Sequence, residues 1–396
     1  MTAPGSGSAS SADEPVLPRY GTADVAMIVP DALRSLTGHA PRVLPLPDGA
    51  RGVVVLVVDG LGRRLLDRHA DVAPFLASAS GPTLDAPFPT TTATSLTSIG
   101  TGLHPGAHGI TGYSVAVEHD DRPLIVLTWS WERHDAALDA RDQVVPERFQ
   151  PRPTLFERAA TDGIAAVTVL RPEFATSGLT RAGLRGGRVV PATGRDATVT
   201  AAVDAAAAPG GPTLVYAHHG DLDAYGHLTG PGSDAWCTEL AAIDALLERT
   251  TCDLPRDVTL VVTADHGMVR VPEDGYIEVA DHPELIAGVR VLTGDARARQ
   301  LHVRPGAATD VLETWRGFCG ARAHVRTRDD AIAAGWFGPG VEPDVRPRIG
   351  DVVVSAIPPD VGWVHRDHDL FGGRVPGMHG AMTPDEIEVP ALVLTC

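Results

Sequence analysis

Short runs of apolar, largely β-branched residues recur along the chain with polar segments between them. The runs are Gly52–Val58, Leu124–Thr128, Ile164–Leu170, Thr213–Ala217, Val258–Thr263 and Pro390–Thr395. Because they are nearly continuous rather than alternating, they predict strands buried on both faces, as in a parallel sheet covered by helices. Helical patterns lie between them at Arg63–His69, Pro153–Asp162, Thr198–Ala208 and Ser233–Thr250. This alternation predicts an α/β fold, a doubly wound and mostly parallel sheet flanked by helices.

Residues 284–350 show a different pattern, with shorter and more polar strand candidates around one helix-like segment. The strand candidates are VRVLTG, RQLHVRPG and ARAHVRTR, and the helix-like segment is ATDVLETWRGFCG. We therefore expect a small α+β insertion at 284–350, within a main domain formed by 21–283 and 351–396. The chain is expected to rejoin the main sheet at Asp351–Ile357. The Gly-, Ser- and Ala-rich segment 1–20 predicts a disordered tail.

Aspartate and histidine gather where predicted strands end. Asp223 and His227 are four residues apart, a spacing that lets both face one ion across a turn. Carboxylate and neutral imidazole suit Zn²⁺ and similar divalent ions. In open α/β sheets, ligands bind at the carboxyl ends of the strands, so the ordered set predicts a metal site at that edge. The full set is Asp59, Asp223, His227, Asp265, His266 and His379.

A threonine-rich segment precedes one helix-like run. Phe88–Gly102 reads FPTTTATSLTSIGTG, and the helical pattern starts near Thr92. A hydroxyl at a helix N-terminus meets unpaired backbone N–H groups and the positive end of the helix dipole, which favour an alkoxide or a phosphate. Helix caps and turn hydroxyls would produce the same pattern, so this segment alone leaves the role of the threonines open.

Charge and cysteine content narrow the possible partners. All 33 basic residues are arginine, and against 50 acidic residues they give a net charge of −17. This balance argues against a nucleic-acid-binding surface, although bound divalent metals could still attract a phosphate substrate. No apolar run reaches the length of a membrane span, and the N-terminus lacks the features of a secretion signal. The 4 cysteines form no Cys-x-x-Cys pair, so we expect free thiols and a cytoplasmic protein.

Taken in order, five segments resemble the nucleotide pyrophosphatase/phosphodiesterase family of the alkaline phosphatase superfamily. They are VVVLVVDGLG, FPTTTATSLTSIGTGLHPGAHGITGY, DAYGH, TADHGM and HGAMTPDEIEVP. The resemblance implies an alkaline-phosphatase-like catalytic domain that binds two divalent ions, expected to be zinc. One ion would be bound by Asp223, His227 and His379. The other would be bound by Asp59, Asp265 and His266, with the Thr92 hydroxyl also contacting it.

The same resemblance implies a nucleophile and a reaction. Thr92 would attack phosphorus in line and form a phosphothreonine, which water would then hydrolyse. Thr90 and Thr91 remain alternative nucleophiles. Ser95 stands where typical members have an asparagine that contacts the transferring phosphoryl group, and its shorter side chain puts the substrate class in doubt. The expected partner is a small phosphate ester or nucleotide.

The arginine distribution favours a substrate with a single negative charge on the phosphoryl group. Phosphate monoesters carry an extra charge, which arginine or a third metal commonly binds. No arginine lies between Arg68 and Arg122, although Arg171 or Arg366 could reach the site from elsewhere. A diester or pyrophosphate is therefore favoured, and its second substituent needs an apolar or aromatic wall. The candidates for that wall are Leu96, Tyr113, Trp129 and Tyr225.

Three alternative functions stay open. A phosphomonoesterase or a phosphonate hydrolase of the same superfamily would use the same motifs. A catalytically inactive metal-binding protein should have lost the nucleophile or a ligand, yet every one of these positions is filled. His365, Asp367 and His368 resemble a metal cluster by composition, but the family pattern leaves them unused, so a loop at the mouth of the site is the simpler interpretation.

Overall fold

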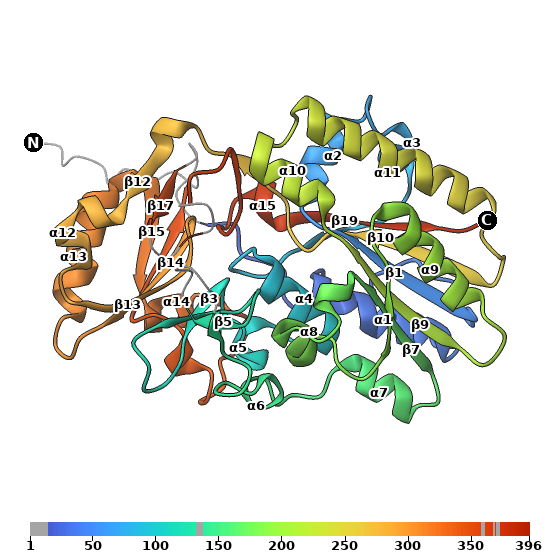
Figure 1. The fold of residues 1–396 in the computed structure, drawn as a ribbon, viewed down its shortest axis with the longest axis horizontal. Coiled ribbons are helices and arrows are strands. Elements are labelled where there is room, and N and C mark those ends of the chain that lie inside the picture. Colours follow the sequence, from blue (N-terminus) through green and yellow to red (C-terminus); the bar gives the residue numbers. More distant parts are fainter. Residues whose placement is uncertain (1–14, 132–137, 358–360, 367–368, 370–372) are drawn as a thin grey trace, which may run out of the picture.

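The computed structural model describes residues 15–131, 138–357, 361–366, 369 and 373–396 and arranges them in two parts, each with its own main sheet (Figure 1). The larger part contains a seven-stranded sheet in the order β2-β19-β10-β1-β9-β7-β8. Neighbouring strands from β10 to β8 run parallel, whereas β19 is antiparallel to both β10 and β2. The strands are β1 (Gly52–Val58), β2 (Thr83–Asp85), β7 (Ala165–Leu170), β8 (Arg188–Pro191), β9 (Thr213–His219), β10 (Val258–Thr263) and β19 (Glu388–Leu394).

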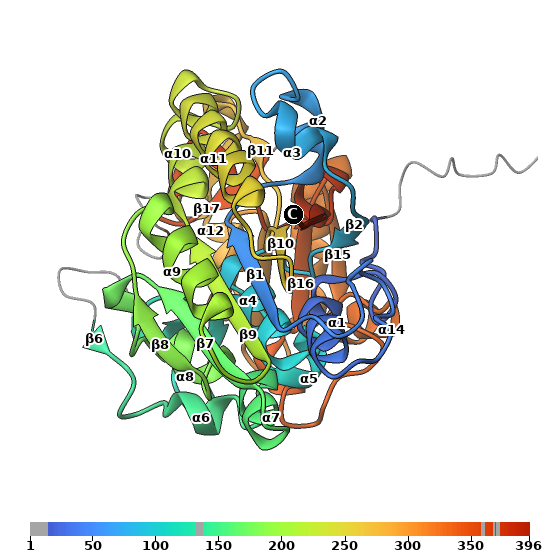
Figure 2. The ribbon, with the colours of Figure 1, turned by 90° about the vertical axis from the view of Figure 1, so that its right-hand side faces the viewer.

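Helices cover both faces of this sheet. Helices α9 and α11 lie on one side of it, with α1 and α7 on the other (Figures 1 and 2). All seven residues of β1 are buried, as the unbroken apolar run predicts for a central strand. The predicted mostly parallel α/β fold is confirmed. The helices of this part include α1 (Ile28–Leu36), α2 (Arg63–Arg68), α4 (Thr92–Thr101), α7 (Leu155–Thr161), α9 (Arg195–Ala207), α10 (Asp221–Thr229) and α11 (Asp234–Cys252).

The smaller part is built on an antiparallel four-stranded sheet in the order β13-β14-β16-β15. Helix α13 (Ala308–Cys319) packs Val311, Trp315 and Cys319 into a separate hydrophobic core with this sheet. The strand and helix candidates read from residues 284–350 are all present here. The strands are β13 (Val289–Asp295), β14 (Ala298–Val303), β15 (Ala323–Thr327) and β16 (Val352–Ala356).

Two strand predictions are wrong. The segment Asp351–Ile357 does not rejoin the main sheet, because β16 pairs with β14 and β15 of the smaller sheet. The segment Leu124–Thr128 is not a central parallel strand either. Its residues contribute to β4 (Pro123–Ile125), which belongs to an antiparallel sheet with β3 (Ser114–Ala116) and β5 (Ser130–Trp131). Apolar content predicts burial, but it does not indicate which sheet buries the strand.

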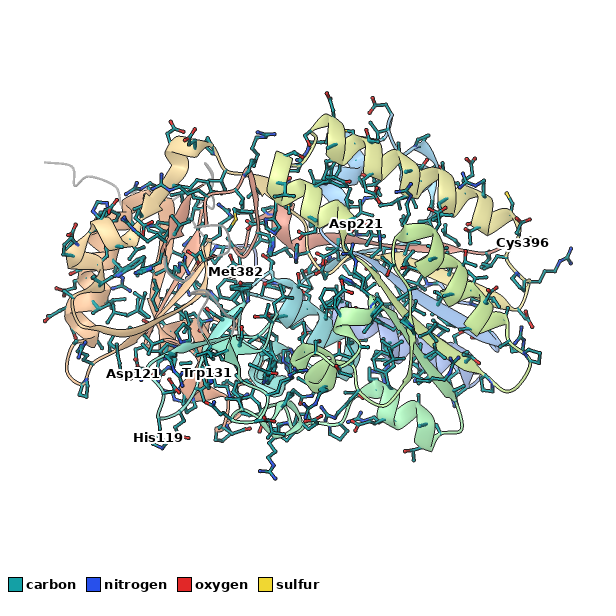
Figure 3. All side chains as sticks on the ribbon, viewed as in Figure 1. His119, Asp121, Trp131, Asp221, Met382 and Cys396 are labelled. Atoms are coloured by element: carbon teal, nitrogen blue, oxygen red, sulfur yellow. The ribbon has the colours of Figure 1, made fainter. Side chains whose placement is uncertain are left out.

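The loop between the sequence HGAM and β19 joins the two parts. Met382 lies where they meet (Figure 3) and packs in one cluster with Phe88 of the larger part and Val353 of β16. In helix α15 (Pro384–Ile387), the Glu386 carboxylate accepts two hydrogen bonds from the Arg297 guanidinium, at 2.8 and 2.9 Å, and both side chains are completely inaccessible. The same carboxylate accepts the backbone N–H of Ala381. This ion pair therefore ties the smaller sheet to the loop that follows His379.

Glu386→Gln should destabilise the protein by about 3–5 kcal/mol, because it leaves the buried Arg297 charge without its counter-ion. Glu388→Gln is the matched control, since the Arg64–Glu388 pair is partly exposed and should contribute about 1 kcal/mol or less. Urea unfolding of both variants measures the difference. Equal losses would show that the buried pair is no more important than the surface pair.

Candidate active site

The ends of three adjacent parallel strands bring the predicted ligands together. Strand β1 lies between β9 and β10, with Val57 level with both His218 and Thr263. Asp59 and Asp265 therefore follow these strands at one edge of the sheet. Helix α10 begins two residues after β9 and places Asp223 and His227, one turn apart, at the same edge. This is the edge at which open α/β sheets bind ligands.

Close backbone packing explains the glycine after His266. A Cβ atom on Gly267 would lie 2.0 Å from the carbonyl oxygen of Asp385. The backbone N–H of Gly267 donates to the carbonyl of Glu386 at 2.8 Å. The requirement is this close approach rather than a left-handed turn. Gly60 differs, because its φ of +74° is in the left-handed region. Both glycines help Asp59 and Asp265 to reach one point.

The three histidines share one hydrogen-bond pattern, in which Nδ1 faces a backbone carbonyl. Nδ1 of His227, His266 and His379 lies 2.8, 3.0 and 2.7 Å from the carbonyl oxygens of Gly377, Gly267 and Thr90, respectively. A carbonyl oxygen only accepts, so each Nδ1 carries the proton and each Nε2 presents a lone pair. This backbone bond to the second ring nitrogen is the usual arrangement around a metal-binding histidine.

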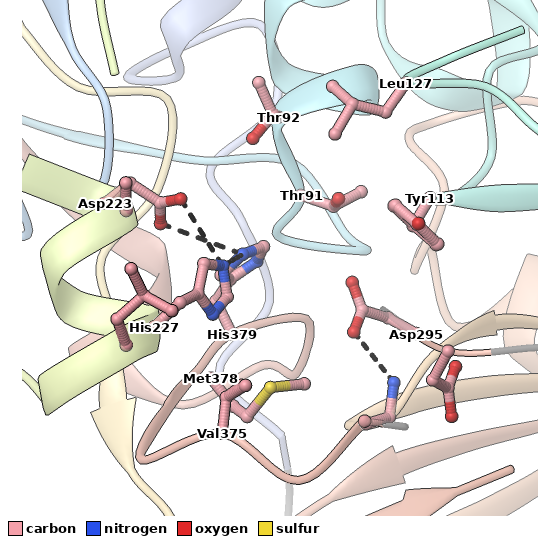
Figure 4. Close-up of a pocket in the computed structure, with 15 residues that line it drawn as sticks. Thr91, Thr92, Tyr113, Leu127, Asp223, His227, Asp295, Val375, Met378 and His379 are labelled. Atoms are coloured by element: carbon pink, nitrogen blue, oxygen red, sulfur yellow. Dashed lines mark hydrogen bonds and ion pairs between the residues drawn. The ribbon is translucent and has the colours of Figure 1, made fainter. Parts of the chain in front are cut away.

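These lone pairs point at one another and at carboxylates. Nε2 of His227 and Nε2 of His379 are 3.2 Å apart, and Nε2 of His227 is 3.4 Å from Asp223 Oδ2 (Figure 4). On the other side of the site, His266 Nε2 lies 3.5 Å from Asp59 Oδ1 and 3.4 Å from Asp265 Oδ2. Such acceptor-to-acceptor contacts require a proton or a cation between the atoms.

Each carboxylate leaves one oxygen without a hydrogen bond. The orphaned buried atoms are Oδ1 of Asp59, Oδ1 of Asp223 and Oδ2 of Asp265. Burial first, and then the negative charges of Asp265 and Asp223, raise the pKa of Asp59 well above its usual value. Burial also holds the pKa of His379 well below its usual value, so this imidazole is neutral. Three orphaned oxygens beside neutral imidazoles fit divalent cations.

The geometry defines two groups of potential ligands that share His266. One consists of Asp59, Asp265 and His266, as predicted, and the other of Asp223, His266 and His379; in each, the ligand atoms lie within 4.8 Å of one another. His227 was predicted in place of His266 in the second group, and it contacts both Asp223 and His379. The structure therefore brings all six predicted ligands into one site.

Thr92 stands beside this site as the first residue of α4. Its Oγ lies 3.3 Å from His266 Nε2, and Thr91 forms the extended N-cap. The Thr90 hydroxyl is engaged elsewhere, since it donates to the carbonyl of Ala381 and accepts the N–H of Gly380. Ser95 follows one helical turn after Thr92. Its side chain is completely buried, its Oγ has no hydrogen-bond partner, and it lines neither cavity described below.

Two cavities of about 260 Å³ each meet at Thr92, and both are also lined by Leu127, Asp223 and Ala224. The first, which we call the Tyr113 cavity, extends toward the smaller sheet; its other lining residues include Tyr113, Leu228, Asp295, Asp369, Val375 and Met378 (Figure 4). The second, the Phe174 cavity, extends along the main sheet; its other lining residues include Leu96, Leu170, Arg171, Phe174, Leu179 and Asp221.

Two of the four predicted wall residues lie elsewhere. Leu96 and Tyr113 line the cavities as expected, but Trp129 is completely buried, and its indole N–H donates to the carbonyl of Val144 at 2.7 Å. Its large apolar ring packs in the core instead. Tyr225 is 40% exposed on α10 and lines neither cavity.

Sequence reasoning left other residues of the site unassigned. His218 Nε2 donates to Asp59 Oδ2 at 3.0 Å, and burial lowers the pKa of His218 to about 4. Arg171 lines the Phe174 cavity and pairs with Asp221, whereas Arg366 pairs with Asp281 outside both cavities.

The remaining predicted cluster is only partly visible. The backbone N–H of His365 donates to Asp369, while Asp367 and His368 lie outside the described residues. Asp295 is an unpredicted cavity residue, and burial raises its pKa to about 6. No sequence signal marks it, because it ends a strand of the smaller sheet rather than of the main one.

Comparisons with known proteins identify a family that spans most of the chain. The chain matches the family described as type I phosphodiesterase / nucleotide pyrophosphatase over residues 53–382. It belongs to that family, so the predictions of the family and of a phosphoric ester hydrolase are confirmed. A search of curated proteins found no match. Among the described residues, no helix combines the length and apolar character needed to cross a membrane.

Solved structures show the same fold. Murine ectonucleotide pyrophosphatase/phosphodiesterase 5 is 15% identical, with a TM-score of 0.63 over 87% of this chain and 88% of that one. An inactive form of that murine protein, in complex with AMP, is 16% identical, with a TM-score of 0.62 over 86% and 87%. Phosphonoacetate hydrolase from Sinorhizobium meliloti 1021, in complex with phosphonoformate, is 19% identical, with a TM-score of 0.62 over 87% and 90%.

Asp59→Asn should raise the thermal midpoint of the chelator-treated protein by roughly 2 °C, because it removes one of three buried charges that repel one another. With excess Zn²⁺ the order should reverse, since the variant has lost a ligand and gains less from binding. Thermal unfolding with and without metal tests both signs. Asp274→Asn, at an exposed acid, is the control. A lower midpoint for Asp59→Asn after chelation would contradict the repulsion.

Proposed function

We propose that this protein is a phosphodiesterase or nucleotide pyrophosphatase that binds two zinc ions and forms a phosphothreonine on Thr92. The observation that carries the proposal is the convergence of six nitrogen and oxygen ligands beside a helix-terminal threonine hydroxyl. Such a mixture of imidazole and carboxylate, without thiolate, suits zinc. A cytoplasmic location remains a prediction and rests on the free cysteines.

The ligand sets follow the two sides of the site. Asp59, Asp265 and His266 would hold the ion next to Thr92. The second ion would be held by Asp223, His227 and His379. When bound, such ions supply positive charge that lowers the pKa of the threonine hydroxyl and stabilises the charge that develops on the phosphoryl oxygens.

The chain itself positions the reacting groups. Thr92 Oγ attacks phosphorus, the bond from phosphorus to the leaving alcohol breaks, and the alcohol departs with a proton. Water then hydrolyses the phosphothreonine and regenerates the Thr92 hydroxyl. Because Thr92 is the first residue of α4, backbone N–H groups of the first turn face the phosphoryl group. Ser95, which was predicted to contact that group, is completely buried and lines neither cavity, so its hydroxyl does not face the phosphoryl position.

The two cavities favour a diester. A phosphorus atom next to Thr92 would have an apolar space on either side, one toward Tyr113 and the other toward Phe174. A phosphate monoester has only one substituent and would leave one space unused. The Phe174 cavity suits an aromatic substituent, because Leu96, Leu170 and Leu179 line it together with Phe174. The complex of the murine neighbour with AMP is consistent with a nucleotide as substrate.

Arg171 separates the diester from the phosphonate alternative. A substrate such as phosphonoacetate carries a carboxylate that a free guanidinium would bind. Arg171 is the arginine in the Phe174 cavity, but Asp221 pairs with it and offsets its charge. This pairing makes a second anionic group on the substrate less favourable than an aryl or nucleoside group.

Thr92→Ala should lower kcat for a phosphodiester by about 10³-fold or more, because the nucleophile is lost. Thr92→Ser should retain part of the activity, and the phosphorylated residue should be detected by mass spectrometry after acid quenching only where a hydroxyl remains. Thr94→Val is the matched control on the same helix. The Thr94 hydroxyl is buried without a hydrogen-bond partner, so its removal should leave turnover and stability nearly unchanged. An active Thr92→Ala enzyme would exclude Thr92 as the nucleophile.

On one zinc-loaded preparation, bis(4-nitrophenyl) phosphate should be cleaved with a kcat/KM at least about tenfold above that of 4-nitrophenyl phosphate, a difference of about 1.4 kcal/mol in transition-state binding. The reason is that only the diester fills both cavities. Initial rates of nitrophenol release measure the ratio. A preference for the monoester would replace the diesterase assignment with the monoesterase alternative.

A further inference from the structure

A fourth histidine at the site hydrogen-bonds in the opposite sense to the three proposed histidine ligands. His218 lies on β9, level with Val57 of β1, and its Nε2 is 3.0 Å from Asp59 Oδ2. Asp59 must be ionised to bind a cation, and an ionised carboxylate only accepts, so Nε2 of His218 carries the proton. In the three proposed ligands, Nδ1 carries the proton and Nε2 presents the lone pair. His218 therefore uses Nε2 to donate to a ligand instead of binding an ion.

The end of β9 holds Asp59 at two points. The backbone N–H of Asp59 donates to the carbonyl of His219 at 3.0 Å, and the Oδ2 atom of its side chain faces His218. The other carboxylate oxygen, Oδ1, is buried without a hydrogen bond and lies 3.5 Å from His266 Nε2. One oxygen of Asp59 is thus bound by the protein, and the other is left for a cation.

Burial makes this hydrogen bond important. The side chains of His218 and Asp59 are 10% and 7% exposed, so water has little access to replace the donor. The terminal torsion of aspartate has broad minima and does not by itself fix the plane of the carboxylate. Without His218, Oδ2 would be a buried acceptor that lacks a donor, and rotation toward the cation would give it a partner. The bond from His218 therefore determines which oxygen the cation meets.

The next histidine on the strand belongs to a different network. Because successive side chains of a strand point to opposite faces, His219 turns away from Asp59. Its Nε2 lies 2.8 Å from Glu239 Oε1 on α11, and Arg195 donates to the second oxygen of Glu239 at 2.8 Å. His219 is buried and paired with a carboxylate, as His218 is, but that carboxylate is not a proposed metal ligand. It therefore provides a matched control.

We propose that His218 is a positioning residue whose Nε2–H holds Asp59 Oδ2 and thereby presents Oδ1 alone to the ion beside Thr92. This inference rests on the two-zinc site of the proposed function and adds to it a residue outside both ligand sets. Loss of a hydrogen-bond partner of a metal ligand typically weakens metal binding by about 10–100-fold. The second ion should be unaffected, because the hydrogen bond of His218 goes to Asp59 and not to a ligand of that ion.

Zinc binding by the metal-free protein, measured by competition with a chromophoric chelator, tests the proposal without turnover. His218→Asn, whose amide is too short to reach Oδ2, should raise the Kd of one ion about 10–100-fold and leave the other Kd within about twofold. His218→Leu, which has no donor, should do the same. His218→Gln places an N–H near the position of Nε2 and should keep both Kd values within about threefold of those of the unchanged protein. His219→Gln should change neither Kd by more than about twofold.

A double-mutant cycle separates positioning from a structural role. In an Asp59→Ala background, His218→Asn should change neither Kd by more than about twofold, because the bond that it breaks is already absent. Unchanged Kd values in both His218→Asn and His218→Leu would overturn the proposal. An equal loss in His218→Gln and His218→Asn, or a loss that persists without Asp59, would overturn it as well. Zinc binding that depends on His218 in a protein that cleaves no phosphodiester would instead overturn the proposed function and leave the positioning role intact.

Discussion

The site depends on three carboxylates held close together without a compensating arginine among the described residues. Asp59, Asp223 and Asp265 each keep one buried oxygen without a hydrogen bond, although their other oxygens are partly or fully engaged. Mutual repulsion in a buried place would normally spread such groups or protonate one of them. The protein instead fixes them with parallel strand ends, a left-handed turn at Gly60 and close backbone packing at Gly267. Bound divalent cations would relieve this repulsion, so we expect metal binding to stabilise this edge of the sheet.

The three imidazole rings of the site are also held in place by hydrogen bonds to the backbone. Each donates its Nδ1 proton to a backbone carbonyl, which leaves no rotational choice and turns Nε2 toward the carboxylates. Two of these carbonyls belong to Thr90 and Gly377. Their neighbours Thr91 and Met378 line the Tyr113 cavity together with Thr92. The loop carrying the proposed nucleophile and the loop carrying His379 therefore hold each other in place. A change in either loop is expected to alter the metal site and the nucleophile together.

Much of this arrangement follows from the sequence, because β-branched runs and Asp/His clusters at strand ends report directly on a buried parallel sheet and its reactive edge. The predictions that failed concern which residues a buried segment packs against, not whether it is buried. β16 is as apolar as a central strand of the main sheet, yet it belongs to the smaller sheet. The aromatic ring of Trp129 would suit the wall of a cavity, yet it packs in the core. Asp295 was missed because a lone acid at the end of a polar hairpin has the same pattern as a surface turn.

The smaller sheet contributes a side chain to the site, because Asp295 lines the Tyr113 cavity. In its hairpin, Asp295 ends β13 and Arg297 lies in the turn before β14, where it pairs with Glu386 in the segment after His379. The hairpin that carries Asp295 and the segment that carries a proposed metal ligand are thus joined through one buried ion pair. Because such a pair does not tolerate the loss of either partner, the insertion cannot shift without moving the cavity wall relative to Thr92. The wall of the Tyr113 cavity and the position of His379 therefore depend on the same contact.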